Sequence, residues 1–364
     1  MVQQQLDQLG LDLNPQTITI QTFKALLSKY ETTVHNKTRR KALTKATPKS
    51  KTKARTGTAK RKGKQEKKQD VSGGIPEQSE KEEEEEEQEK ESNSSRDLDQ
   101  ENAITDAVQQ FKELDNWRYD TLPGLLQKRQ EDEEKSCYLS REEVVRLMEW
   151  KLKHGVNRPM LLGMIRANTE QTVRSATGAA FSSPPSPPLQ GNDKDPEDGF
   201  SALQASLEKL TAPLRGVGPA TASLFLSVYA PKETPFYSDD VFLWLVVGVY
   251  PPPPPPPSSS SLSRSVSEET ERKGSKEVKP NGELNVKYNI PEYRRLWEAV
   301  RVLRERLNKK IDDEAEEVSC ADVEKVALVV RHLDLSELGY GERADEHGDG
   351  RDEGEGETKR RRVR

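Results

Sequence analysis

A Gly-x-Gly turn between two apolar helical patterns constrains the fold of this chain more than any other feature. It comprises Gly216 and Gly218 within residues 214–222. Two glycines one residue apart let the backbone turn sharply, because neither carries a Cβ atom. Pro219 suits the first turn of a following helix, where its missing N–H costs nothing. The segment therefore predicts two helices joined by a tight hairpin, with free main-chain N–H groups that suit a phosphate at the start of the second helix.

Apolar residues elsewhere recur at helical spacing, and no segment alternates in the manner of a strand. Ser140 with Glu143 three residues later is a capping box, and Gly155 fits the end of that helix. Further helical patterns begin at four positions, which are Pro159, Thr169, Pro291 and Ser319. The sequence thus predicts an all-α fold.

About a third of the residues are charged, which is too polar for one continuous globule of 364 residues. The charges are segregated, because residues 37–68 hold fifteen Lys or Arg and one acid, and the sign reverses over 77–101. Like-charge blocks stay extended, and seven consecutive prolines from Pro251 are typical of an unpacked insertion. We therefore expect a helical domain over 102–250 and 286–336, a short helical segment at 1–35, a disordered basic then acidic tract at 36–101, a disordered Pro/Ser-rich insertion at 251–285 and a disordered charged tail at 337–364.

Few residues suit redox or metal chemistry. Two cysteines, Cys137 and Cys320, make neither a disulfide framework nor a metal site, and His154 and His332 have no partner at metal-ligand spacing. No secretory segment opens the chain, and the longest apolar stretch, 241–250, is half of what a membrane span needs. We expect no metal, no cofactor, no membrane association and a reducing compartment.

An acidic pair opens another helical pattern about twenty residues beyond the hairpin. The order of helix, Gly-x-Gly hairpin, apolar helix, short loop and acid resembles the helix-hairpin-helix superfamily of DNA glycosylases, the endonuclease III-like enzymes. The resemblance implies that Asp239, or alternatively Asp240, is a catalytic carboxylate that stabilises the cationic sugar formed as a base leaves, or activates water. A purely structural alternative is that Ser238 caps the helix and that acids favour its first turn.

The same resemblance assigns non-specific contacts with DNA phosphates to the hairpin. The expected DNA-binding residues are Arg215, Gly216, Val217, Gly218, Ala220 and Thr221. Alternatively, the two glycines only make a tight turn between helices.

The chain departs from the enzymes at three points. Ala220 stands where bifunctional members carry a lysine nucleophile, so imine and lyase chemistry is not expected from that position. Two cysteines cannot hold the iron–sulfur cluster of other members. The histidine and arginine that commonly follow the family's aspartate are also absent, since this stretch reads Val241, Phe242 and Leu243.

Three segments, 139–159, 214–223 and 236–240, are similar to the Amun-like group of glycosylase-related nuclear proteins. The first contains the run REEVVRLMEWKL from Arg141 and the pair Arg158-Pro159. The resemblance covers about half of the chain. It implies a glycosylase-like helical fold and association with chromatin.

Two basic clusters fit nuclear import or electrostatic contact with nucleic acid, with a solvated tail as the alternative. Their members are Arg39, Arg40, Lys41, Lys60, Arg61 and Lys62, and Lys359, Arg360, Arg361 and Arg362. We expect a nuclear protein whose partners are DNA and chromatin proteins, and whose function is non-specific binding of the DNA backbone. The alternatives are a monofunctional DNA N-glycosylase in base excision repair, a catalytically inactive chromatin- or transcription-associated interaction protein, and a protein-binding scaffold without nucleic-acid contact.

Overall fold

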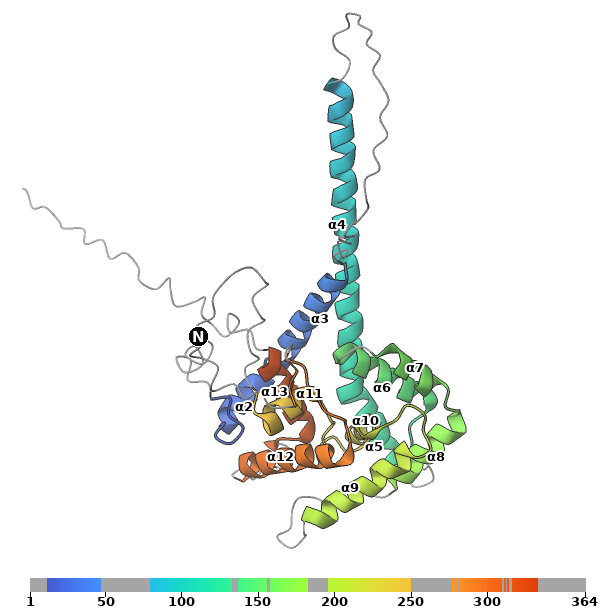
Figure 1. Ribbon diagram of the computed structural model, residues 1–364, viewed down its shortest axis with the longest axis vertical. Coiled ribbons are helices and arrows are strands. Elements are labelled where there is room, and N and C mark those ends of the chain that lie inside the picture. Colours follow the sequence, from blue (N-terminus) through green and yellow to red (C-terminus); the bar gives the residue numbers. More distant parts are fainter. Residues whose placement is uncertain are drawn as a thin grey trace, which may run out of the picture.

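The computed structural model describes residues 12–46, 79–132, 137–155, 158–182, 196–249, 277–279, 282–309, 311, 313 and 316–332 (Figure 1). In chain order its helices are α2 (Ile20–Leu27), α3 (Tyr30–Ala46), α4 (Ser79–Asn116), the π-helix η1 (Trp117–Thr121), α5 (Leu122–Glu131), α6 (Arg141–His154), α7 (Pro159–Arg166), α8 (Glu170–Phe181), α9 (Pro196–Thr211), α10 (Pro219–Tyr229), α11 (Asp239–Val241), the π-helix η2 (Phe242–Val247), α12 (Ile290–Asn308) and α13 (Cys320–His332).

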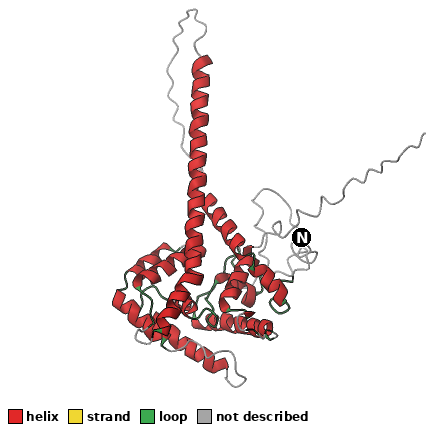
Figure 2. Cartoon of the chain, turned by 180° about the vertical axis from the view of Figure 1, so that it is seen from behind, coloured by secondary structure: helices red, strands yellow, loops and turns green. Residues whose placement is uncertain are grey.

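Helices account for nearly all regular structure in these residues (Figure 2). No β-strand occurs among them, and a single antiparallel bridge joins Val278 to Leu284. The prediction of an all-α protein is confirmed at this level. Within the described ranges, no helix is both long enough and apolar enough to cross a membrane.

Capping residues in the sequence predicted the starts of several helices correctly, because a helix cap depends on residues close together in the chain. Ser140 and Glu143 form the reciprocal capping box at the start of α6, and Gly155 follows its last residue. Pro159 occupies the first turn of α7, and Thr169 accepts a hydrogen bond from the first turn of α8. These caps satisfy donors that a helix leaves free at its start.

The helices form two groups on either side of α10 (Figure 1). In that view α6, α7 and α8 lie to the right and α2, α12 and α13 to the left, while α4 rises out of the body. Helix α10 packs against α5, α6, α8, α9 and α12, and its residues from Ala220 to Val228 are all buried. This central helix therefore fixes the hairpin that precedes it relative to both groups.

The N-terminal part of the chain differs from expectation. Residues 36–46 belong to α3 and residues 79–101 to α4, although the sequence predicts no regular structure between 36 and 101. Helices α2 and α3 pack on α13, and α3 also lies along α4. Tyr30 of α3 donates a hydrogen bond to Asp115 of α4, whose other oxygen accepts from the Trp150 indole. Residues 12–46 are thus part of the helical body, which begins well before residue 102.

The insertion predicted to be disordered over 251–285 also differs from expectation near its end. There, Val278 and Leu284 form an antiparallel bridge. Cys137 and Cys320 are free thiols, and Cys320 is buried.

Candidate functional site

The Gly-x-Gly segment forms the predicted hairpin between α9 and α10. Gly216 has a φ of +76°, which favours glycine, and a Cβ atom added there would lie 2.8 Å from the Cβ of Met164 in α7. Gly218 has an extended backbone, and a Cβ atom there would meet nothing within 4 Å. The fold therefore requires glycine at 216, whereas nothing in the packing requires it at 218.

The Asn168 side chain, which sequence reasoning missed, holds the hairpin in place from the C-terminal end of α7. Its Oδ1 atom accepts from the Arg215 N–H at 2.8 Å, and its Nδ2 atom donates to the Arg215 carbonyl at 3.0 Å. Nδ2 also donates to the Ile165 carbonyl at 3.0 Å. An Asn at the junction of two helical patterns is a weak sequence signal, because its partner lies 47 residues away.

The hairpin has one packed side and one open side. Leu214 and Val217 are buried, and Gly216 lies against α7, while Arg215 and Gly218 are exposed. Within the part of the chain that the structure describes, the N–H groups of Gly218 and Ala220 have no acceptor. The open side therefore presents main-chain donors next to a cationic side chain.

A cleft of about 510 Å³ begins at this open side. Its walls bring together the hairpin, α3, α6, α11 and α13 with the 277–288 segment. Six of its lining residues are cationic and three are acidic, namely Lys37, Lys151, Arg158, Lys279, Lys287 and Arg331, and Asp239, Asp240 and Glu283. The excess of positive charge favours an anionic ligand.

Asp239 is the first residue of α11 and lines the cleft beside the hairpin, as does Asp240. Its Oδ1 atom accepts from the Tyr288 hydroxyl at 2.9 Å. Burial raises the pKa of Asp239, and the Tyr288 hydrogen bond, Arg158 and Lys151 oppose that rise. Ser238 caps the helix through the Asp240 N–H, so the structural role proposed for Ser238 is confirmed and coexists with a carboxylate in the cleft.

Tyr288, a residue that sequence reasoning did not single out, holds Asp239 from a strained backbone. Among the described residues it is the one non-glycine with a positive φ, at 56°. Such conformations persist where the surrounding structure enforces them, and they cluster at functional sites. The Arg158 guanidinium lies 5.2 Å from the centre of its ring. The ring is thus held between a carboxylate and a cation.

The Lys151 amine enters the same cleft from α6. Its Nζ atom donates to the Ala220 carbonyl at 2.7 Å and to the Thr221 hydroxyl at 3.0 Å. It lies 5.4 Å from the centre of the Phe236 ring. Burial lowers the pKa of Lys151 to about 7, and Asp239 opposes that effect.

His154 and His332, which the sequence does not assign to a metal site, lie in the wall of the cleft. His154 stacks on Trp150 with ring centres 4.5 Å apart, and neither of its nitrogens has a partner in the described structure. Burial lowers the pKa of His332 to about 4 and that of His154 well below its usual value. No group of three His, Cys, Asp or Glu side chains suited to a metal occurs among the described residues.

Arg39 and Lys41 of the first basic cluster contact other helices of the fold. Arg39 pairs with Glu101 of α4 at 2.8 Å. Lys41 donates to the carbonyls of Lys153 and Gly155 at the end of α6, which is where a cation stabilises a helix. Lys60, Arg61, Lys62 and the cluster from Lys359 to Arg362 lie outside the described residues.

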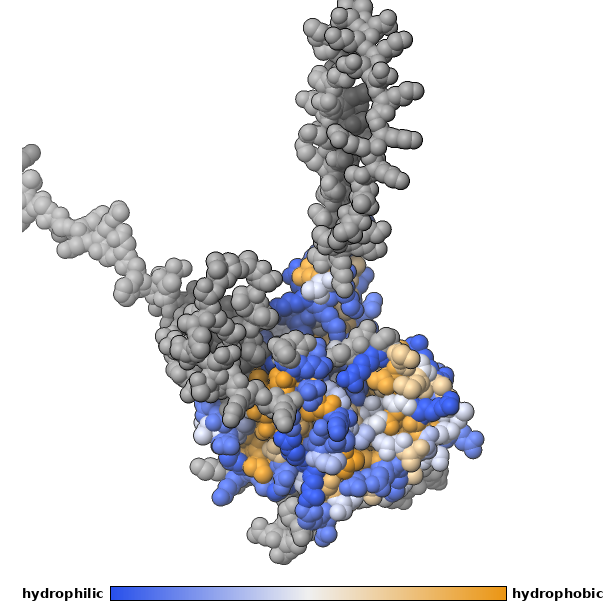
Figure 3. Space-filling model, in the orientation of Figure 1, coloured by the Kyte–Doolittle hydropathy of each residue, from blue (hydrophilic) through white to orange (hydrophobic). Residues whose placement is uncertain are grey.

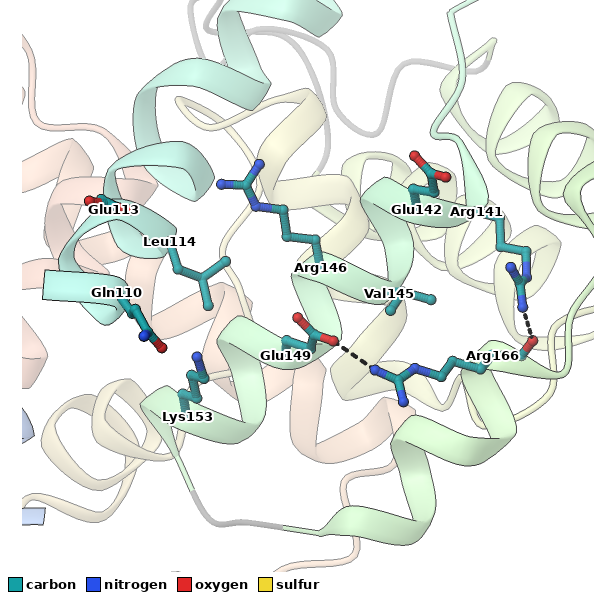
Figure 4. Close-up of a pocket in the computed structure, with 10 residues that line it drawn as sticks. All are labelled: Gln110, Glu113, Leu114, Arg141, Glu142, Val145, Arg146, Glu149, Lys153 and Arg166. Atoms are coloured by element: carbon teal, nitrogen blue, oxygen red, sulfur yellow. Dashed lines mark hydrogen bonds and ion pairs between the residues drawn. The ribbon is translucent and has the colours of Figure 1, made fainter. Parts of the chain in front are cut away.

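A second groove, of about 490 Å³, lies between α4, α6 and α7 (Figure 4). Its charges are mixed, and Figure 4 shows Glu149 paired with Arg166 and Arg141 reaching the Arg166 main chain. The Arg146 guanidinium lies 4.2 Å from the centre of the Trp117 ring. This groove holds none of the predicted site residues.

No protein-family model, no curated protein and no solved structure matches this chain.

Proposed function

We propose that this chain is a nuclear protein that binds the DNA backbone through the hairpin at residues 214–222. The observation that carries the proposal is the open side of the hairpin, where the N–H groups of Gly218 and Ala220 lie free beside exposed Arg215. Main-chain donors at a helix start bind phosphate without reading sequence. The cationic excess of the adjoining cleft supports the same ligand.

A specific observation favours base excision as the second candidate function. Asp239 is partly buried in a cleft that begins at the hairpin, which is the arrangement a flipped base needs to reach a carboxylate. Ionised Asp239 would stabilise the cationic sugar as the base leaves. In this proposal the chain has the glycosylase-like fold of the helix-hairpin-helix superfamily and belongs with the Amun-like group.

Binding is tested with Gly218→Glu, measured by fluorescence anisotropy on an undamaged duplex at two salt concentrations. The substitution places a carboxylate where the phosphate would lie, and its Cβ has open space. We expect affinity to fall about tenfold or more, equivalent to about 1.4 kcal/mol, with unchanged helix content. Wild-type affinity should also fall as salt rises, because bound phosphates release counterions.

Gly124→Glu is the matched control, since Gly124 in α5 also has no atom within 4 Å of an added Cβ and lies outside the cleft. Equal affinity of Gly218→Glu and Gly124→Glu would overturn the proposal. Gly216→Glu is unsuitable, because positive φ and the 2.8 Å approach to Met164 would disturb the fold itself.

A further inference from the structure

One group of side chains in the cleft comes from helices outside the hairpin. Its members are Lys37 of α3, His154 at the end of α6, and Arg331 and His332 at the end of α13. Besides burial, which is the largest cause, Lys37 lowers the pKa of both histidines, and Arg331 lowers those of Lys37 and His332. These four side chains, which we call the α3–α6–α13 cluster, therefore lie close enough to interact.

Two members of the α3–α6–α13 cluster carry buried nitrogen atoms that have no partner in the described structure. The His154 side chain is 6% exposed, and neither its Nδ1 nor its Nε2 atom has a hydrogen-bond partner. In Arg331, Nη2 donates to the Gly282 carbonyl at 2.6 Å, whereas the buried Nη1 atom has no acceptor. A buried donor without an acceptor is destabilising, and folded proteins leave few of them. These donors are therefore available to an acceptor that enters the cleft.

Positive charge surrounds the two histidines. Burial lowers the pKa of His332 to about 4 and is also the largest cause of the low pKa of His154. The cationic neighbours that lower these values further are Lys37, Arg40, Lys41, Arg118 and Arg331. The acids that oppose the lowering are Asp240 at His332, and Asp240, Asp115 and Asp239 at Lys37. Because an anion among like charges relieves their repulsion, the cluster favours an anionic ligand.

We propose that the α3–α6–α13 cluster binds a phosphate monoester, at a site separate from the hairpin. A phosphate monoester carries close to two negative charges at neutral pH and has three free oxygens that are strong acceptors. Lys37 Nζ, a ring nitrogen of His154 and Arg331 Nη1 supply one donor from each of three helices. A phosphodiester within a continuous strand has one charge and two free oxygens, so it matches this donor set less well. The monoester belongs either to the end of a nucleic-acid strand or to a free nucleotide.

Titration calorimetry of the intact chain with inorganic phosphate at neutral pH tests the proposal, with chloride of equal ionic strength as the reference. Lys37→Gln and Arg331→Gln each remove a cation and keep a polar side chain. We expect each to weaken phosphate binding about tenfold or more, because charge-assisted hydrogen bonds are lost. Lys112→Gln is the matched control, since Lys112 is exposed on α4 and lies outside the cleft. It should bind phosphate as wild type does.

A second measurement needs no variant, so it stays valid if a substitution disturbs folding. Proton NMR follows the titration of the four histidines of the chain. Phosphate in the cluster opposes the surrounding cations, so it should raise the pKa of His332 from about 4 toward the usual value of histidine, and raise that of His154 as well. His35, which is exposed on α3 and lies outside the cleft, should titrate identically with phosphate and with chloride.

Two further probes distinguish the sources of the monoester. They are deoxyadenosine 5′-monophosphate, and a duplex with or without phosphate at its 5′ ends. A gain in affinity from the 5′-phosphate that is lost in Lys37→Gln would assign the site to a strand end. Binding of the mononucleotide without such a gain would assign it to a free nucleotide.

Phosphate and mononucleotide that bind no better than chloride, or equal phosphate affinity of Lys37→Gln and Lys112→Gln, would refute the inference. The site does not depend on the proposed DNA binding, so Gly218→Glu should leave phosphate binding unchanged. Failure of the hairpin test and failure of the phosphate test are therefore distinguishable.

Discussion

At the scale of single residues, the cleft sets apart two neighbouring carboxylates that the sequence left as alternatives. Asp239 accepts the Tyr288 hydrogen bond and opposes the lowered pKa of Lys151. Asp240 acts on the pKa of Lys37 more strongly than Asp239 does, and it also acts on that of His332, toward the α3 and α13 side of the cleft. We therefore assign the proposed chemistry to Asp239.

Asp239→Asn should abolish release of a base from a damaged duplex and leave DNA binding unchanged, because the amide cannot stabilise a cation by its charge. Burial raises the pKa of Asp239, so wild-type base release should fall on acidification at a higher pH than a free aspartate would give. Excision assays over a lesion panel between pH 5 and 8 measure both effects. Asp106→Asn, on the exposed surface of α4, is the control. Undiminished excision by Asp239→Asn would contradict the assignment.

At the scale of secondary-structure elements, the sequence predicts the features that depend on residues close together in the chain. The capping box at Ser140 depends on hydrogen bonds within a few residues, and the turn at Gly216 depends on the positive φ that glycine allows. Both form as predicted. Inclusion of α3 could not be predicted, because it depends on the hydrogen bond from Tyr30 to Asp115, 85 residues away, and on packing against α13. Its charges instead resemble those of an extended tail.

The same limit applies to the site. The hairpin and Asp239 belong to recognisable motifs, whereas Lys151 lies on a helix with an ordinary amphipathic pattern. Its importance arises from burial and from two acceptors that are 69 and 70 residues distant. Likewise, Tyr288 reaches Asp239 across 49 residues, including the Pro-rich insertion.

Asn168→Ala tests whether the end of α7 positions the hairpin. The substitution removes two hydrogen bonds to Arg215, one to Ile165 and one to Met164, and the part-buried N–H and carbonyl groups of Arg215 lose this partner. We expect a loss of roughly 1–3 kcal/mol in the free energy of unfolding, together with weaker DNA binding. Urea unfolding and anisotropy measure the two effects. Gln127→Ala, at an exposed position of α5, should change stability by less than about 0.5 kcal/mol. An equally small change for Asn168→Ala would show that Asn168 does not brace the hairpin.

At the scale of the whole molecule, a buried ion pair joins two helices whose paired residues lie 206 positions apart in the chain. Arg118 of η1 donates to Glu324 of α13 at 2.7 Å and to Ser227 of α10 at 3.1 Å. The side chains of Arg118 and Glu324 are 1% and 3% exposed. On the face drawn in Figure 3, hydrophobic residues form scattered patches among polar ones. The pair of Arg118 and Glu324, in contrast, is buried and links η1 to α13.

Glu324→Leu should destabilise the protein by about 3–5 kcal/mol, because it leaves the Arg118 charge buried without its partner. The double substitution of Arg118→Met with Glu324→Leu should be less destabilising than Glu324→Leu alone, since no charge remains buried. Chemical unfolding followed by circular dichroism measures both. The Arg118 guanidinium also lies 3.9 Å from the centre of the Tyr119 ring and 4.8 Å from that of the Trp150 ring. A double variant that is less stable than the single one would show that Arg118 contributes mainly through these rings and through Ser227.

The position of α3 in the fold limits where this protein can be truncated. Lys37 forms part of the cleft wall, and Lys41 caps the helix that carries Lys151. A shortened version that starts at residue 102, where charge and periodicity place the boundary, would discard both lysines and uncover the apolar surface of α13. A lack of activity of such a fragment in an excision assay would therefore reflect the loss of part of the cleft wall. Assays should use the intact chain.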